Sequence, residues 1–356
     1  MLRHTLGLLG DGSDVLGYDD AVSTDHMWGP RFHLFLRPED MPLKSGLDSL
    51  FREHLPTTFM GYSVNYSGTP GRDGEIRVPE PIPEGPVSAL YWIHTPADFL
   101  HTHLGLLPAD AFDWLALSEH RLLGLTGGQL FVDNMQFGNT LASLSHYPQE
   151  VRMHLIASQW TMIAEERAFA KRCATVGDDM GSRLVTARIV ERLIRLCFLY
   201  ANRYAPYSKW LGTAFARLAV PDDLRDALRN ALAADTIAQR EPALVQAQLL
   251  VARTHNGTGL TKHVPVSVQP YFDRDIQVID TDALAEAARE TIGDPLLRAM
   301  PAVGTFSQVG NFVHLSDPPH LVPVVAAFFR RAAQENLSRN NPAAPSNAVH
   351  PVDDLQ

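Results

Sequence analysis

The chain has 356 residues, of which 45% are hydrophobic and 20% charged, a composition typical of a folded protein long enough for two domains. Its 40 acidic residues outnumber its 30 basic ones, and the net charge of −10 disfavours nucleic acid as the main partner, because neutralising phosphates needs a basic surface. No run approaches the roughly 18 apolar residues of a membrane span. The first acidic residue, Asp11, comes too early for a signal peptide. We therefore expect a cytoplasmic protein without a membrane or nucleic-acid partner.

The first part of the chain, residues 1–146, mixes short strand-like runs with short helices and many prolines and glycines. Alternating or aromatic-rich runs predict strands at 31–37, 58–66 and 89–95 and within 127–134. Two segments with Pro-Ala-Asp near their start predict short helices within 96–105 and 108–124. This pattern favours a mixed sheet domain.

From residue 147 the pattern becomes helical, with apolar residues spaced for one buried face. Helices are predicted at 148–173, 182–204, 209–218, 221–232, 242–255, 281–292 and 320–336. A short extended piece at 268–279 interrupts them, and the polar, proline-rich residues 337–356 predict a disordered tail. We therefore expect an α+β protein, with a sheet domain at 1–146, a helical domain at 147–336 and the tail.

Residues 10–31 crowd five aspartates beside a turn at Gly12 and Ser13. Such a turn leaves backbone N–H groups accessible, which suits the phosphates of a nucleotide. Eleven residues separate Ser13 from Asp25, enough for a helical turn and a return into a strand. On a strand, residues 25 and 27 share a face, where two carboxylates would hold divalent cations against phosphates. Asp25 meets this requirement, and Met27 does not.

The Gly-Ser pair, the eleven-residue gap and the run Thr-Asp-His-Met at 24–27 together resemble the nucleotidyltransferase signature. More closely, VLGYDDAVSTDHMWGPR resembles an uncharacterised bacterial family of that superfamily, whose usual form reads Ser-x-Asp-His-Asp-Trp-Gly-Pro-Arg. The later runs YPQEVR, YAPYSKW, PYFDRDIQVI and GTFSQVGNFVHLSDPP are similar to landmarks of the same family. The resemblance implies a nucleotidyltransferase-type mixed sheet followed by an all-helical domain.

Carried over to this chain, the resemblance implies that Gly12 and Ser13 cradle the nucleotide phosphates and that Asp25 is the first ligand of Mg²⁺. Met27 takes the place of the second ligand, and its thioether cannot replace the hard oxygen that magnesium demands.

Three interpretations of Met27 remain open. The protein has reduced or lost transferase activity, or Asp19 or Asp20 bends in to restore the metal site, or the position carries a chance or engineered change.

For three further residues, two roles are predicted and both remain open. The resemblance implies a third carboxylate that serves as metal ligand or as base, and Asp133 is the best candidate, although an aspartate there also suits a cap of the strand or next turn. Arg31 contacts phosphate or pairs with a nearby aspartate. Lys209 balances triphosphate charge, or its stem covers Trp210.

The resemblance thus predicts a magnesium-dependent enzyme that transfers a nucleoside monophosphate from ATP, or another nucleoside triphosphate, to a hydroxyl or amine of an unidentified small molecule. By analogy with antibiotic-modifying enzymes, an acidic cleft would favour a cationic acceptor. Met27 favours an alternative, a catalytically impaired nucleotide-binding or interaction protein on the same fold. A third prediction is transfer of AMP to a protein side chain.

Overall fold

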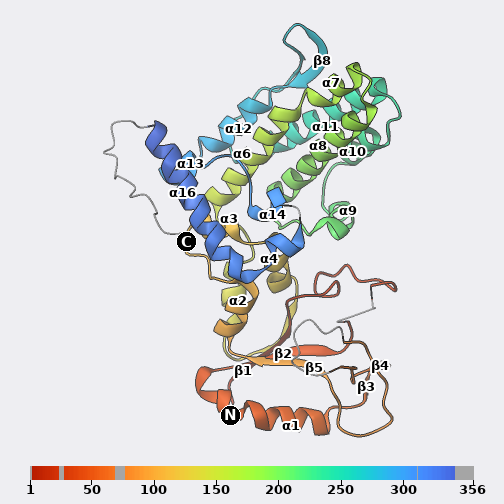
Figure 1. The fold of residues 1–356 in the computed structure, drawn as a ribbon, viewed down its shortest axis with the longest axis vertical. Coiled ribbons are helices and arrows are strands. Elements are labelled where there is room, and N and C mark those ends of the chain that lie inside the picture. The colour runs from red at the N-terminus through yellow and green to blue at the C-terminus, as the bar shows by residue number, and fades with distance from the viewer. Residues whose placement is uncertain (1, 24–27, 69–76, 311, 341–356) are drawn as a thin grey trace, which may run out of the picture.

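The computed structural model describes residues 2–23, 28–68, 77–310 and 312–340. A four-stranded sheet, in the order β5-β2-β1-β6, lies toward one end of the molecule (Figure 1). Its strands are β1 (His4–Leu8), β2 (Arg31–Leu36), β5 (Leu90–His94) and β6 (Gln129–Asp133). β1 is antiparallel to both β2 and β6, whereas β2 and β5 are parallel. The strands predicted at 31–37, 89–95 and within 127–134 are confirmed, and β1 is a strand that the sequence pattern does not predict.

The two faces of the sheet are covered differently, because successive side chains of a strand point to opposite sides. Leu34 and Leu36 of β2 join Ile93 in a small core on one face, where α1 (Lys44–His54) packs after the 3-10 helix η1 (Pro38–Leu43). Phe35 points to the other face and belongs to the main core.

The segment predicted as one strand at 58–66 is instead a tight hairpin of β3 (Thr58–Phe59) and β4 (Tyr62–Ser63). Met60 and Gly61 reverse the chain with φ values of 51° and 85°. The Met-Gly pair at the centre of the run is the turn signal that the hydrophobic pattern concealed.

Short helices cover the sheet face opposite α1. They are α2 (Pro96–Leu104), α3 (Ala111–Ala116), α4 (Glu119–Thr126) and α5 (Phe137–Ser143). Thr95 and Asp110 cap α2 and α3 by accepting hydrogen bonds from first-turn N–H groups, as the Pro-Ala-Asp segments suggest. The segment 108–124 forms two helices rather than one because Leu117 is extended.

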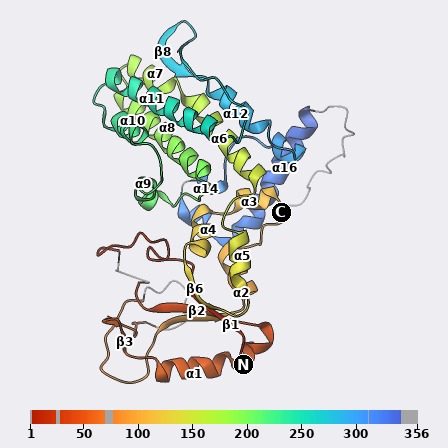
Figure 2. The same cartoon turned by 180° about the vertical axis from the view of Figure 1, so that it is seen from behind.

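The rest of the described chain is helical except for one hairpin, and Figure 2 shows this region from behind. The helices are α6 (Gln149–Glu166), α7 (Phe169–Thr175), α8 (Asp179–Tyr200), α9 (Ser208–Ala216), α10 (Asp222–Ala233), α11 (Ile237–Gly257), α12 (Thr281–Arg289), α13 (Pro295–Ala299), α14 (Phe306–Gly310), α15 (Val313–Ser316), η2 (Pro319–Leu321) and α16 (Val322–Asn340). The hairpin pairs β7 (Val268–Tyr271) with β8 (Arg274–Ile279), where the extended piece is predicted. The predicted α+β class, a mixed sheet followed by helices, is confirmed.

One main core runs from Leu9, beside the sheet, to Ala333 in α16. The predicted boundary at residues 146 and 147 falls between α5 and α6, and the division into domains stays a prediction. α16 extends through the first residues of the predicted tail, and residues 341–356 lie outside the described residues. None of the described helices is long and apolar enough to span a membrane.

Candidate functional site around the N-terminal turn

Residues 11–20, here called the N-terminal turn, begin after the two residues that follow the end of β1. The helical turn expected after Ser13 is instead a set of turns, in which Gly17 N–H donates to Asp14 O at 3.0 Å and Tyr18 N–H to Ser13 O at 2.8 Å. The backbone N–H groups of Gly12 and Ser13 donate to no acceptor in the described part of the chain. They are therefore available to an anion. Asp25 and Met27 lie outside the described residues.

Arg31 binds two residues of the N-terminal turn through its guanidinium. Its guanidinium donates to both carboxylate oxygens of Asp14, at 2.5 and 2.7 Å, and to the backbone oxygen of Asp11 at 3.1 Å. The Arg31 side chain is 2% exposed, so these contacts are shielded from water. Of its two predicted roles, the structure has Arg31 paired with an aspartate.

Gly12 lies directly against the guanidinium of Arg31. A Cβ atom built on Gly12 would lie 2.2 Å from Arg31 Nη2 and 2.4 Å from Asp14 Oδ1, and φ is +136°. Because the Arg31 side chain is buried and both of its Nη atoms donate to Asp14, the guanidinium has little room to move aside. A side chain at residue 12 therefore conflicts with the shape of the turn.

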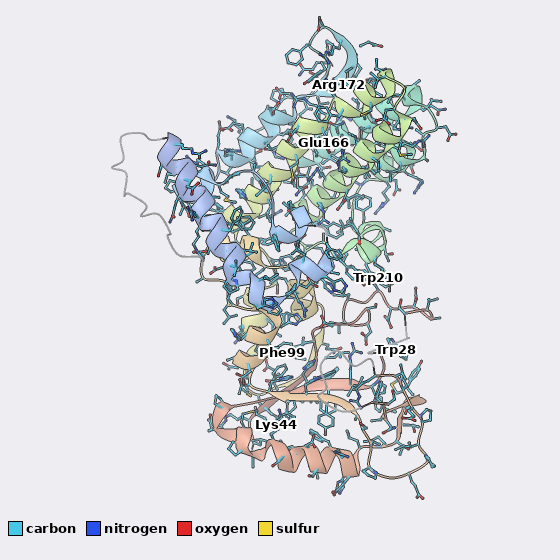
Figure 3. All side chains as sticks on the ribbon, viewed as in Figure 1. Trp28, Lys44, Phe99, Glu166, Arg172 and Trp210 are labelled. Atoms are coloured by element: carbon cyan, nitrogen blue, oxygen red, sulfur yellow. The ribbon has the colours of Figure 1, made fainter. Side chains whose placement is uncertain are left out.

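Helix α9 contacts the same turn from the helical region. The ring of Trp210 stacks on Tyr18, with centroids 5.8 Å apart and planes 26° from parallel. The guanidinium carbon of Arg217 lies 4.8 Å from the centre of the Tyr18 ring, and Arg217 Nη1 donates a hydrogen bond to Gly17 O at 2.5 Å. Lys209 Nζ lies 4.8 Å from the centre of the Trp210 ring, the second of its two predicted positions. Figure 3 labels Trp210 on α9, above the sheet.

Asp133 is not beside the turn. In the antiparallel register of β1 and β6, Leu8 pairs with Gln129 and Thr5 with Asp133, so Asp133 lies at the end of β1 opposite the turn. Its carboxylate accepts hydrogen bonds from Thr5 Oγ1 at 2.6 Å and from two backbone N–H groups at the start of α5. Burial raises the pKa of Asp133, but these hydrogen bonds outweigh it and the net shift is downward.

This geometry corrects the expected role of Asp133. It caps α5, the second of its two readings, and the structure does not bring it to Gly12 and Ser13. The reason is register: because β1 and β6 are antiparallel, the end of one lies beside the beginning of the other.

The described aspartates of the turn each have a partner already. Asp11 pairs with Arg121, Asp14 with Arg31, Asp19 accepts from Trp28 Nε1, and Asp20 accepts from the N–H groups of Val22 and Ser23. The hydrogen bonds from Ser23 and Val22 lower the pKa of Asp20.

Within the described ranges, no group of three or more His, Cys, Asp or Glu residues is arranged to hold a metal ion. The fit of Mg²⁺ therefore depends on Asp25, outside those ranges.

Sequence reasoning missed a buried ion pair close to this site. Glu119, at the start of α4, lies 3.3 Å from Arg195 of α8, and their side chains are 5% and 6% exposed. Glu119 also accepts from Gln308 Nε2 at 3.3 Å and from Ala205 N–H at 3.4 Å. Burial raises the pKa of Glu119 against the opposing charge of Arg195. The signal in the sequence was Arg195 inside an otherwise apolar helical run, which indicates a buried partner but does not say which one.

Comparison with known proteins gives one family match. Residues 114–211 match the model of a domain of unknown function, DUF4037, and this stretch contains Glu119, Arg195 and Lys209. No curated protein matches the chain. Among solved structures, the chain is similar to a nucleotidyltransferase-like protein from Exiguobacterium sibiricum 255-15, with 11% identity, 78% of this chain and 91% of that chain covered, and a TM-score of 0.34. A likeness at this TM-score carries no argument about function.

Proposed function

We propose that this protein binds a nucleoside triphosphate at the N-terminal turn and, with Mg²⁺, transfers the nucleoside monophosphate to a hydroxyl or amine of a small molecule. One observation carries the proposal. The turn that the sequence singles out for phosphate binding and the helix that bears Lys209 are far apart in the chain, yet they meet through Tyr18 and Trp210.

The chain's own residues have these roles in the proposal. The free N–H groups of Gly12 and Ser13 bind phosphate oxygens, as backbone N–H groups of tight turns do. Arg31 fixes the shape of the turn through Asp14 rather than touching phosphate. Lys209, held over Trp210 beside the turn, contributes positive charge toward the triphosphate.

Asp25 is the proposed metal ligand, on the evidence of the sequence alone. When bound, Mg²⁺ would neutralise the charge that develops on the phosphates. In the transfer, a bond forms between the acceptor oxygen or nitrogen and the α-phosphorus, the bond from that phosphorus to pyrophosphate breaks, and the acceptor's proton is released to water.

A second candidate function, nucleotide binding without transfer, is favoured by Met27. A thioether in place of a carboxylate removes one negative charge and one hard ligand from the cation. Both functions predict nucleotide binding, and only the first predicts release of pyrophosphate.

Pyrophosphate release separates the two functions. With ATP, Mg²⁺ and a panel of small hydroxylated and amine acceptors, we expect Met27→Asp to raise the rate about tenfold or more, because it restores the second carboxylate. Asp25→Asn should abolish release in either background. The matched control is Asp226→Asn, the same carboxylate-to-amide change at an exposed position of α10 outside the N-terminal turn, and it should leave the rate unchanged. No release by wild type or Met27→Asp over the whole panel would refute transfer and leave the binding function.

A further inference from the structure

The imidazole of His120, the second residue of α4, is partly buried in the wall of a cavity of about 120 Å³ where α4, α9 and α15 begin. Its ring packs edge-on against Tyr207, which precedes α9, with centroids 4.8 Å apart. In the described part of the chain, neither ring nitrogen has a hydrogen-bond partner; Nδ1 is buried, whereas Nε2 is not. His120 therefore supports the fold through no side-chain hydrogen bond, and Nε2 is free to contact a ligand.

The groups around His120 suit a ring that is neutral at rest and can take a proton. Burial is the main cause that lowers the pKa of His120, Arg121 acts in the same direction, and the carboxylates of Asp317 and Asp11 oppose them. Arg121 lies 3.3 Å from Asp11 and 3.9 Å from Asp317, so one guanidinium is shared by two carboxylates. His103, also within electrostatic range, is itself neutral because burial lowers its pKa to about 4. The carboxylate charge in excess would stabilise an imidazolium at His120.

The neighbours of His120 in the chain place it beside the N-terminal turn. Arg121, the next residue, pairs with Asp11, which directly precedes Gly12. Helix α9, whose first residue lines the cavity, stacks Trp210 on the same turn. In Figure 1, α4 lies between the sheet and the long helices. The cavity that exposes His120 therefore adjoins the turn where the proposed function places the phosphates.

Two carboxylates that come into question as a base are engaged elsewhere. Asp133, for which the resemblance implies that role, lies at the end of β1 opposite the turn. Glu119 lines the cavity but is bound to Arg195 at 3.3 Å, and Arg195 also pairs with Glu191 at 2.9 Å. His120 differs from both in having a titratable nitrogen without a partner, which suits a group that takes up a proton during a reaction.

We propose that His120 is the general base of the transfer and that its Nε2 takes the proton of the acceptor hydroxyl or amine. This inference rests on the proposed function. As the acceptor atom bonds to the α-phosphorus and the bond from that phosphorus to pyrophosphate breaks, the acceptor's proton moves to Nε2, and His120 then passes it to water. The carboxylates of Asp11 and Asp317 stabilise the imidazolium formed in between. The acceptor atom reaches Nε2 from the side of the cavity.

Pyrophosphate release with ATP and Mg²⁺ tests the base role, in whichever of wild type and Met27→Asp is faster and with the panel acceptor that this parent uses best. We expect His120→Gln to lower kcat about a hundredfold or more, because a positioned base contributes about 10²–10⁴ to a rate. The affinity for ATP, measured by calorimetry, should change by less than about threefold, which also shows that the variant is folded. Added imidazole should restore part of the rate, because the free base replaces the missing ring. His101→Gln, at an exposed position of α2, is the matched control and should keep both values.

The dependence of kcat on pH gives a second readout. In the parent, kcat should fall as the pH is lowered and His120 becomes protonated, and in His120→Gln this fall should disappear. A kcat of His120→Gln within about threefold of the parent would overturn the base role. So would a loss of rate that imidazole does not rescue and that leaves the fall with pH in place. If no acceptor of the panel gives pyrophosphate release, the proposed transfer fails and the base role fails with it; if release occurs and His120→Gln behaves as its parent does, the transfer stands and the base role alone fails.

Discussion

Replacing Arg195 with methionine is expected to lower the free energy of unfolding by about 3–5 kcal/mol, the cost of leaving one member of a buried ion pair without its partner. The substitution leaves the Glu119 carboxylate 5% exposed, with hydrogen bonds from Gln308 and Ala205 but no cation. Arg195 also pairs with the partly exposed Glu191 at 2.9 Å. The double variant Glu119→Gln with Arg195→Met should therefore recover the part of the loss that comes from the buried Glu119 charge, while the pairing with Glu191 stays lost. Urea denaturation followed by circular dichroism at neutral pH measures all three values.

The matched control for this pair is an exposed one. Arg229 and Asp226 on α10 pair at 3.0 Å with side chains 72% and 62% exposed, so Arg229→Met should cost at most about 1 kcal/mol. A cost below about 1 kcal/mol for Arg195→Met, or no recovery in the double variant, would contradict a buried pair that joins α4 to α8.

Mild acid is expected to destabilise the protein steeply. Burial is the main cause that lowers the pKa of His33 to about 3 and those of His103, His154 and His255 to about 4, against an ordinary value of 6.5. Since the unfolded chain binds protons first, this stability is fully present above pH 6.5 and is lost as the pH falls toward the folded values. Each histidine loses about 1 kcal/mol between pH 6.5 and 5.5, which makes about 4 kcal/mol for the four.

Urea denaturation at a series of pH values checks this expectation. Two variants test whether the buried histidines cause the change of the free energy of unfolding with pH, called the slope below. His154→Leu removes a buried imidazole whose Nε2 has no partner among the described residues, and it should reduce the pH dependence by one histidine's share. Ser49→Asn, an exposed change on α1 that involves no titrating group, is the matched control and should leave the slope unchanged. Equal stability at pH 5.5 and 7.5 would contradict the burial of these four neutral rings.

The elements of the fold follow from local patterns, and their pairing does not. The aromatic alternation at 31–37 and the Pro-Ala-Asp segments predict β2 and α2 at nearly their observed bounds. The hairpin at 58–63 was hidden because its reversal needs only two residues, Met60 and Gly61, within an otherwise strand-like run. β1 spans only five residues, too few for the periodicity of an apolar run to stand out.

In the candidate site, too, local features can be predicted from the sequence, whereas long-range pairing cannot. Chemistry and local spacing predict a phosphate-binding turn at Gly12 and Ser13 and a role for Lys209 in balancing phosphate charge, and both roles stay predictions. The position of Asp133 could not be predicted, since it depends on the register of β1 with β6. Neither could the pairing of Glu119 with Arg195, which joins residues of α4 and α8 that lie far apart in the chain. Long-range register and packing are set by the whole core rather than by any short stretch.

The central claim, that the N-terminal turn binds a nucleoside triphosphate, is tested most directly by calorimetric titration of ATP and other nucleoside triphosphates with Mg²⁺ into wild type, Gly12→Ala and Gly17→Ala. We expect one saturable site with micromolar affinity in wild type. Gly12→Ala should weaken binding about tenfold or more, because its Cβ would meet Arg31 Nη2 at 2.2 Å and strain the backbone. Gly17→Ala, in the same turn, also places a side chain at a positive φ of +69° but has nothing within 4 Å of its Cβ, so it isolates the backbone strain and should weaken binding less than Gly12→Ala does. Absence of saturable binding for every triphosphate, or wild-type affinity in Gly12→Ala, would contradict the account.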